Sequence, residues 1–586
     1  MRRPNLVKTS LLAAALAGSA AVVGCALASE RAPQSAAADP HSLRAPKKAA
    51  ARDAGEARAN AEVAQTAPGD GPQERSFLPP SSPPMPASIA PPPSASVALR
   101  GPSAVGDQRK AEPPRRGAVG DVLTDVDRVT EGGTFVHAGT NPFVLTAVDH
   151  LSTFAADVDT GSFTFARRFL RQGQQPPPAA VRVEEWVNAL GYTYDAPTNA
   201  GSVPFVVHAA GAPSPLSPGK HVVRVALKGR EVSRHERAPT SLVFLVDVSG
   251  SMSEPDKLPL AQEALHLLVN QLREDDAVGL ATYAGATRLV LPLTTARSKS
   301  QIHAAIDALQ SGGGTDMGSG MEMAYREATK GLGGGRSARV IVLSDGDANI
   351  GNVGYDDILR SVKGYVSEGV MLSTVGLGTG NYNDHLMEQL ADAGNGNYSY
   401  IDSLKTAEKT FVQNLEGTLE TIAQDVKIQV EWNKDVVSSY RLLGYENRDV
   451  VDEDFRNDKK DAGEIGAGHA VTALYEVELA QAAPRGDLGV VRVRAKAPRG
   501  TRADELVAPI PAAALRARAD DLDDDGRAAV AVALAAEILR GSPYASGHDL
   551  ADAAALLESA ARGRFAEERR ELAAELRRVA PVLARR

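Results

Sequence analysis

The chain has very little of the chemistry that would place it quickly in a class of proteins. Among 586 residues there is a single cysteine, Cys25, so no disulfide can form within one molecule and the folded part must be stable without cross-links. Acidic residues outnumber basic ones, which gives a formal net charge of −9. Because nucleic-acid-binding proteins are more often basic, we expect no nucleic-acid partner.

Catalytic and zinc-binding motifs are also missing from the sequence. The 11 histidines form no H-E-x-x-H or comparable cluster, so a zinc site is not expected. Ser249 follows Val248 instead of lying in a G-x-S-x-G turn, and no histidine–aspartate pair is placed to activate it. We therefore predict that the protein is not an enzyme, with a hydrolase or a phosphotransferase as the less favoured alternative.

One acidic pair needs a separate interpretation. Asp157-x-Asp159 is similar to the aspartate pair of phosphotransferases, but Gly161 stands where threonine or valine is usual, and no lysine-bearing motif follows in order. Short acidic side chains before a helix commonly cap its first backbone N–H groups. We interpret the pair as a turn and a helix N-cap.

The first residues have the features of an export signal. A short basic stretch, MRRPNLVK, precedes the apolar run TSLLAAALAGSAAVVG, which is too short to span a bilayer comfortably. The run ends in VVGC, residues 22–25, which resembles the lipobox of bacterial lipoproteins. The resemblance implies that residues 1–24 are a signal peptide and that Cys25 is acylated. The mature protein would then be a membrane-anchored lipoprotein of the cell envelope, facing the periplasm or the cell surface.

Residues 25–118 are rich in alanine, proline and serine, as in FLPPSSPPMPASIAPPPSAS. The segment shows no apolar periodicity and has few large apolar side chains, so it cannot bury enough surface to fold. A flexible coil of about 90 residues has a root-mean-square reach of roughly 50 Å. We predict a disordered tether between the lipid anchor and the folded part.

Two kinds of periodicity follow in the remaining sequence. Residues 119–200 repeat apolar positions at helical spacing on both sides of QQPPPA, which predicts two helices. Residues 201–240 and 424–510 alternate with period two, which predicts strands, and residues 511–586 are expected to be helical. Since neither set of strands is long enough to be stable alone, we predict that they pair in one β-sandwich-like domain.

Residues 241–420 combine fully apolar runs with amphipathic helical segments. Strand–helix alternation of this kind predicts an α/β domain with a doubly wound, mostly parallel sheet that is covered by helices on both faces. The closely spaced runs AVGLATYAG and TRLVLPL predict a hairpin that places one antiparallel strand at an edge. This domain would be inserted between the two halves of the β-sandwich.

Oxygen-bearing residues follow the ends of the predicted strands. The first strand leads into Asp247-x-Ser249-x-Ser251, whose alternate side chains share one side of an extended loop. Thr315 follows three glycines, and Asp345 ends a later strand. Ligands of doubly wound sheets bind at the carboxyl ends of strands, and these oxygens suit Mg²⁺, Mn²⁺ or Ca²⁺. The sequence therefore predicts a divalent metal site built from these five residues.

This order of residues is similar to the metal-ion-dependent adhesion site (MIDAS) of von Willebrand factor type A (vWA) domains, which have a Rossmann-like fold. All five positions of the motif are present. Residues 141–194 and 440–479 also resemble the segments that flank the domain in bacterial YfbK-like vWA lipoproteins. The resemblance implies an envelope protein that binds an unknown partner protein, with an acidic side chain of the partner completing the metal coordination. The alternative is a scaffold that binds its partners without metal.

Overall fold

The computed structural model describes residues 126–129, 133–136, 139–198, 203–346, 355–378, 382–481 and 484–583. The predicted signal peptide, Cys25 and the predicted tether lie outside the described residues. All described residues belong to the compact unit that runs from Ala111 to Arg586. Within them, no helix has the length and apolar character that crossing a membrane requires.

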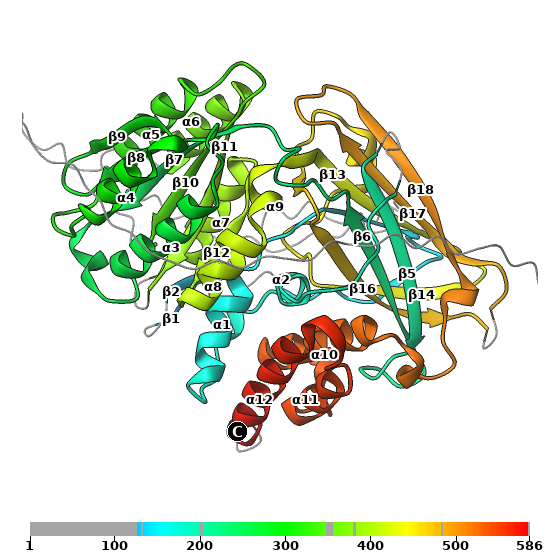
Figure 1. Ribbon diagram of the computed structural model, residues 1–586. Helices are drawn as coiled ribbons and strands as arrows, with labels where there is room; N and C mark the ends of the chain where they lie inside the picture. The colour runs from blue at the N-terminus through cyan, green and yellow to red at the C-terminus, as the bar shows by residue number, and fades with distance from the viewer. Residues whose placement is uncertain are drawn as a thin grey trace, which may run out of the picture. The chain divides into compact units, whose positions relative to one another are not determined.

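A six-stranded sheet in the order β12–β11–β10–β7–β8–β9 forms the centre of the α/β part (Figure 1). Its strands are β7 Thr240–Asp247, β8 Ala277–Tyr283, β9 Arg288–Thr295, β10 Ser337–Ser344, β11 Val370–Leu377 and β12 Tyr398–Ile401. All neighbours are parallel except β8 and β9, so the predicted hairpin and its antiparallel edge strand are confirmed. Strand β7 lies in the interior of the sheet, and all of its residues are buried.

Helices cover both faces of this sheet. They are α3 Leu258–Gln271, α4 Lys299–Asp307, α5 Met317–Thr329, α6 Tyr355–Ser367, α7 Asp384–Ala393, α8 Leu404–Glu408 and α9 Leu415–Leu419. Because side chains of a strand alternate between faces, Phe244 packs with α3 and α4, whereas Val243 and Leu245 pack with α5, α6 and α7. A π-helical turn at Lys409–Gln413 lies between α8 and α9.

Two further sheets share one apolar core and form the β-sandwich. One contains β15–β13–β17–β18 with β4 paired to β13, and the other has the order β3–β14–β16–β6–β5. Their strands are β3 Val144–Leu145, β4 Leu151–Ala155, β5 Phe205–Pro213, β6 His221–Gly229, β13 Thr421–Trp432, β14 Val437–Leu443, β15 Gly463–Gly466, β16 Ala470–Leu479, β17 Asp487–Lys496 and β18 Ala503–Pro511. Strand β6 pairs with β16, so strands from both sides of the α/β part do build one sandwich, as predicted. The helical prediction for residues 119–200 is wrong in part, because β3 and β4 lie there and β4 pairs with β13.

Five helices from the two ends of the described chain share another core (Figure 1). They are α1 Gly161–Arg171, α2 Val183–Asn188, α10 Asp524–Leu539, α11 Leu550–Ser559 and α12 Ala566–Leu583. Helix α2 is much shorter than the sequence pattern suggested. Beyond its end, the backbone N–H and the hydroxyl of Thr193 both donate to Asp525 at 2.7 Å, a contact across 332 residues. A hairpin of β1 Val126–Val129 and β2 Gly133–Val136 precedes these elements.

Candidate functional site

Loops at the carboxyl end of the central sheet carry the predicted metal ligands. Strand β7 ends at Asp247, and the loop after it contains Ser249 and Ser251. Asp345 directly follows β10, the parallel neighbour of β7, so the two carboxyl ends lie at the same edge of the sheet. Thr315 lies just before α5. The order of the strands thus brings Asp247 and Asp345 to one edge of the sheet. The last residue of β10, Ser344, donates a hydrogen bond to Asp247 although 97 residues separate them in sequence.

The loop that carries Thr315 is tied to the serine loop by backbone hydrogen bonds. The N–H of Gly250 donates to the carbonyl of Gly313 at 3.1 Å, and the N–H of Gly312 donates to the carbonyl of Val248 at 2.7 Å. Gly313 has a φ of +90°, and a Cβ there would lie 3.2 Å from the nitrogen of Gly285. Glycine at this position therefore permits the close approach of the two backbone segments.

Asp247 is fully buried and already oriented. Its Oδ1 accepts from the N–H of Ser249 at 2.9 Å, and its Oδ2 accepts from the hydroxyl of Ser344 at 3.0 Å. The hydroxyls of Ser249 and Ser251 lie 3.0 Å apart. Burial raises the pKa of Asp247 above its usual range, and the charge of Asp345 adds to the rise. A cation at this edge would offset that unfavourable charge.

The candidate metal site also contains a lysine that the sequence did not predict. The ammonium of Lys257 donates to Oδ2 of Asp345 at 2.8 Å and to the carbonyl of Ser251 at 3.0 Å. The side chains of Lys257 and Asp345 are only 9% and 3% exposed. The sequence offered one indication of this residue, because Lys257 is the only lysine or arginine between residues 241 and 271.

The donor set fits a hard divalent ion. Two carboxylates and three hydroxyls offer only oxygen, which Mg²⁺, Mn²⁺ and Ca²⁺ prefer. Thr315 is half-buried beside Asp316, whose side chain caps α5 by accepting from the N–H of Ser319 at 3.3 Å. Asp316 is therefore occupied as a helix cap, and Thr315 is the candidate ligand of that loop.

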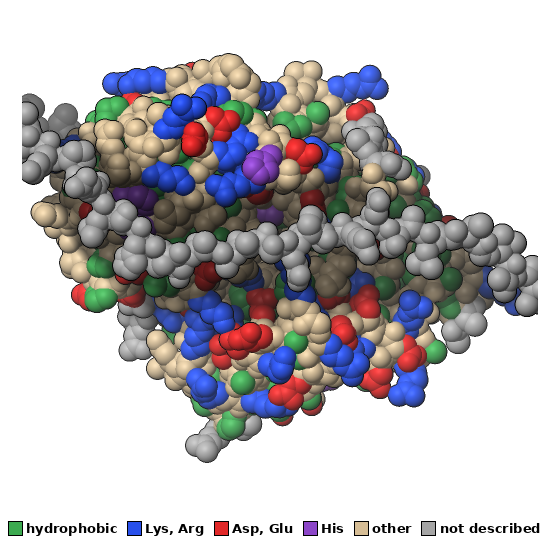
Figure 2. Space-filling view, in the orientation of Figure 1, with side chains coloured by type: hydrophobic (Ala, Val, Ile, Leu, Met, Phe, Trp, Pro, Cys, Tyr) green, Lys and Arg blue, Asp and Glu red, His purple; other side chains and the backbone are tan. Residues whose placement is uncertain are grey.

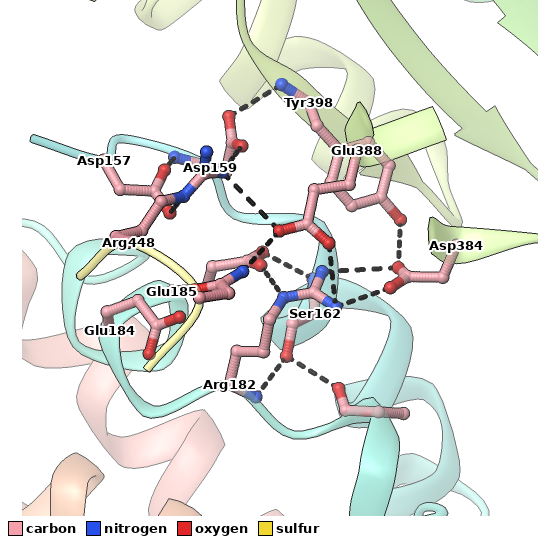
Figure 3. A network of polar contacts seen from close by, with 12 residues as sticks. Asp157, Asp159, Ser162, Arg182, Glu184, Glu185, Asp384, Glu388, Tyr398 and Arg448 are labelled. Carbon is pink, nitrogen blue, oxygen red and sulfur yellow. Dashed lines mark hydrogen bonds and ion pairs between the residues drawn. The ribbon is translucent and has the colours of Figure 1, made fainter. Parts of the chain in front are cut away.

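A second cluster of polar groups lies deep inside the unit, and Asp157 and Asp159 belong to it (Figure 3). Asp157 does form the predicted turn, because its Oδ1 accepts from the N–H of Asp159 at 2.8 Å. The predicted helix N-cap is wrong: α1 has Thr160 at that position, without a capping side-chain hydrogen bond. Both carboxylates instead bind the guanidinium of Arg448, at 3.0 and 3.1 Å.

Arg182 is the other cation of this buried network (Figure 3). It binds Glu185 of α2 and Asp384 at the start of α7, the latter at 2.5 Å. The hydroxyl of Tyr398 on β12 donates to the same Asp384 at 2.6 Å, and the N–H of Ser162 donates to Glu185 at 2.8 Å. The network therefore joins the segment before the α/β part, the α/β part itself and, through Arg448, the sandwich.

Several acids of the network hold their protons near neutral pH. Burial raises the pKa of Glu184 to about 7, of Glu185 to about 8 and of Glu388 to about 7. The cause is that charged carboxylates are unfavourable where water is excluded and other carboxylates are close. The cluster thus combines charged and neutral acids around two arginines.

A further group of acids lies on the sandwich. Carboxylate oxygens of Asp425, Asp461 and Glu464 lie within 4.8 Å of one another. Burial, together with a hydrogen bond to Asp425, raises the pKa of Asp461 to about 6, and Lys496 forms an ion pair with Asp425. The ammonium of Lys496 therefore relieves part of the repulsion in this group.

Charges of both signs are interspersed on the surface over the C-terminal helices, as Figure 2 shows for one face. Arg577 of α12, for example, pairs with Glu558 of α11. Arg577 therefore belongs to a mixed, solvated surface.

Comparisons with known proteins define the class. A model of the von Willebrand factor type A domain matches residues 241–414, and a von Willebrand factor model matches residues 130–224. A third model, described as the C-terminal part of the uncharacterized protein YfbK, matches residues 417–580. The fold and these matches define a vWA-domain protein, a class that indicates protein interaction or adhesion and often uses a metal at the MIDAS.

The relatives define the family more narrowly. Uncharacterized protein YfbK of Escherichia coli strain K12 is 39% identical over 427 residues, which cover 69% of this chain and 73% of that protein. The chain belongs to the YfbK family of vWA-domain proteins. Uncharacterized protein sll0103 of Synechocystis is 29% identical over 206 residues, covering 35% of this chain and 46% of that protein.

Solved structures add only a general likeness. A von Willebrand factor type A protein from Catenulispora acidiphila is 20% identical, with 64% of this chain and 89% of that chain covered and a TM-score of 0.38. A mussel byssus thread matrix protein solved with a zinc-occupied MIDAS motif is 22% identical, with 30% and 45% covered and a TM-score of 0.26. The family assignment rests on the sequence matches.

Proposed function

We propose that this protein is a lipid-anchored protein of the cell envelope whose vWA domain binds a partner protein through a divalent cation. Mg²⁺ is the first candidate for the ion, and Mn²⁺ and Ca²⁺ offer the same ligand chemistry. The observation that carries the proposal is the pairing of β7 with β10, which brings Asp247 and Asp345 to one edge beside the tied serine and threonine loops.

The chain's own groups suit a binding role. Ser249, Ser251 and Thr315 are neutral donors, so an ion held by them keeps positive charge that can attract a carboxylate from outside. Asp247 is preorganised by two hydrogen bonds, which reduces the entropy lost when an ion is bound. The Oγ atoms of Ser249 and Ser251 face each other at 3.0 Å, an arrangement that suits two ligands of one ion better than a nucleophile and its base.

Calorimetry and thermal unfolding of the mature chain with Mg²⁺ and Mn²⁺ test the proposal. An ion at 100 times its dissociation constant should stabilise the folded state by about 2.7 kcal/mol. Asp247→Ala should abolish binding, and Thr315→Ala should weaken it roughly tenfold or more, the range seen when a supporting group of a metal site is lost.

The control must not disturb the fold. Replacing a buried aspartate that forms an ion pair, such as Asp157 or Asp525, would disturb the fold. We therefore choose Asp520→Ala as the control, because the side chain of Asp520 is 77% exposed. This variant should bind Mg²⁺ as the wild type does. Absence of divalent binding by the wild type, or equal binding by Asp247→Ala, would make the metal-independent scaffold the better account.

A further inference from the structure

We propose that Lys257 is a built-in counter-ion of the candidate metal site, which stabilises the site without a divalent ion and weakens the binding of that ion. The inference rests on the proposed metal-dependent function and adds how occupancy of the site is regulated. It makes Lys257 a positioning residue that acts through Asp345 and sets the ion concentration at which the site fills.

The first argument is the position of the ammonium group. It lies 2.8 Å from Oδ2 of Asp345 and 3.0 Å from the carbonyl oxygen of Ser251, so it links two of the loops that carry predicted ligands. The pair is nearly buried, and salt screens such a pair much less than one on the surface. A divalent ion that uses Asp345 must therefore share this carboxylate with a positive charge.

The second argument is that the lysine stem is confined. At Gly378, just after β11, an added Cβ would lie 2.3 Å from Cγ of Lys257, and the φ of +73° also favours glycine. The carbonyl of Gly378 accepts from Arg168 of α1 at 3.1 Å and from the hydroxyl of Tyr400 on β12. The backbone against which the lysine packs is thus held from its other side, and the ammonium is directed toward Asp345.

The third argument is the balance of charge. Asp247 is satisfied by neutral donors, Ser249 and Ser344, whereas Asp345 receives a full positive charge. One lysine therefore compensates half of the negative charge of the two aspartates. A divalent ion approaching this edge gains less from Asp345 than it would without the lysine, and it is repelled by the ammonium.

Two neutral substitutions separate charge from hydrogen bonding. Lys257→Met keeps the apolar stem, and Lys257→Gln keeps a donor for Ser251. Lys257→Arg retains the charge, and Lys330→Met is a matched control at a lysine that is 60% exposed. Each mature full-length chain is titrated with MgCl₂ in a calorimeter, and its melting temperature is measured in EDTA and in Mg²⁺.

Both neutral variants should bind Mg²⁺ at least tenfold more tightly than the wild type, whereas Lys257→Arg and Lys330→Met should stay within threefold of it. The neutral variants should also melt lower in EDTA, because Asp345 is left buried beside Asp247, and should gain more from Mg²⁺. Affinities within threefold of the wild type, or weaker, in both neutral variants would overturn the inference while leaving the proposed function intact.

Two other outcomes of the Mg²⁺ titration also test the inference. Mg²⁺ binding by the neutral variants but not by the wild type would support the inference in its strongest form, with the lysine replacing the ion altogether. If neither the wild type nor the neutral variants bind Mg²⁺, the proposed function and this inference fail together.

Discussion

Raising the pH from 5.5 to 8 should draw protons from three buried glutamates, and this titration should destabilise the fold. The ordinary pKa of a glutamate is 4.5, whereas burial raises the pKa of Glu184 and Glu388 to about 7 and of Glu185 to about 8. Between these values the folded protein keeps protons that the unfolded chain has released. Stability from this source is therefore fully present below about pH 4.5 and is lost as the pH rises toward 8.

The size of the effect follows from proton linkage. Each group that is protonated only in the folded state lowers the free energy of unfolding by roughly 1.4 kcal/mol per pH unit. Glu185 and Glu388 both contact Arg182, and Glu388 also contacts Arg448, so the protons of these two acids leave in coupled steps. Other groups titrate as well: burial lowers the pKa of His469 to about 4, and its contribution to stability rises with pH up to about 6.5.

A single variant isolates the network from these other groups. Glu185→Gln keeps an oxygen that can accept from the N–H of Ser162 but cannot ionise. Its free energy of unfolding should fall less steeply than that of the wild type between pH 5.5 and 7, by up to about 1.4 kcal/mol per unit. Urea denaturation at each pH measures both slopes, and Glu274→Gln, whose side chain is 78% exposed, is the control. Identical slopes for wild type and Glu185→Gln would refute the reasoning.

Two further predictions concern other parts of the chain. Arg441 is fully buried and donates to Glu476 at 2.8 Å and to Glu537 at 3.1 Å, so Arg441→Met should lower the free energy of unfolding in urea by about 3–5 kcal/mol, and a loss below about 1 kcal/mol would contradict this interpretation. Cys25→Ser should stop lipidation and move the protein from the membrane fraction to a soluble or unprocessed form; unchanged membrane association and mass would rule out the lipobox interpretation.

Apolar periodicity was sufficient for most of the fold. Strand β7 and its neighbours are largely apolar runs that the pattern identifies directly, and β6 and β16 alternate regularly. Strands β3 and β4 were missed because residues 119–200 were predicted to be helical. Strands β14 and β18, after the α/β part, were not recognised individually, for physical reasons. Strand β14 carries the buried Arg441, whose charge is matched by Glu476 and Glu537, both distant in sequence. Strand β18 ends its sheet and contains Pro509 and Pro511, which edge strands tolerate but which argue against a strand in the sequence.

The candidate site was predictable to the extent that its residues follow strand ends. Asp247, Ser249 and Ser251 form one spaced motif, so their common edge follows from the spacing of the residues alone. Lys257 could not be placed, because its partner Asp345 is 88 residues away and nothing in the local pattern requires the lysine to turn inward. Local spacing predicts which ligands share a loop, whereas the compensation of their charge depends on contacts distant in sequence.

The same reasoning bears on why the vWA domain is accompanied by its flanking segments. Asp384 and Glu388 of α7 are buried, and their arginine partners, Arg182 and Arg448, come from the segments before and after the domain. Removing one partner of a buried ion pair is strongly destabilising, by about 3–5 kcal/mol, because it leaves an uncompensated charge. Residues 241–420 alone would keep the acids and lose both arginines. The buried acids of α7 therefore require arginines from the flanking segments, and the stability of the α/β part depends on residues outside it.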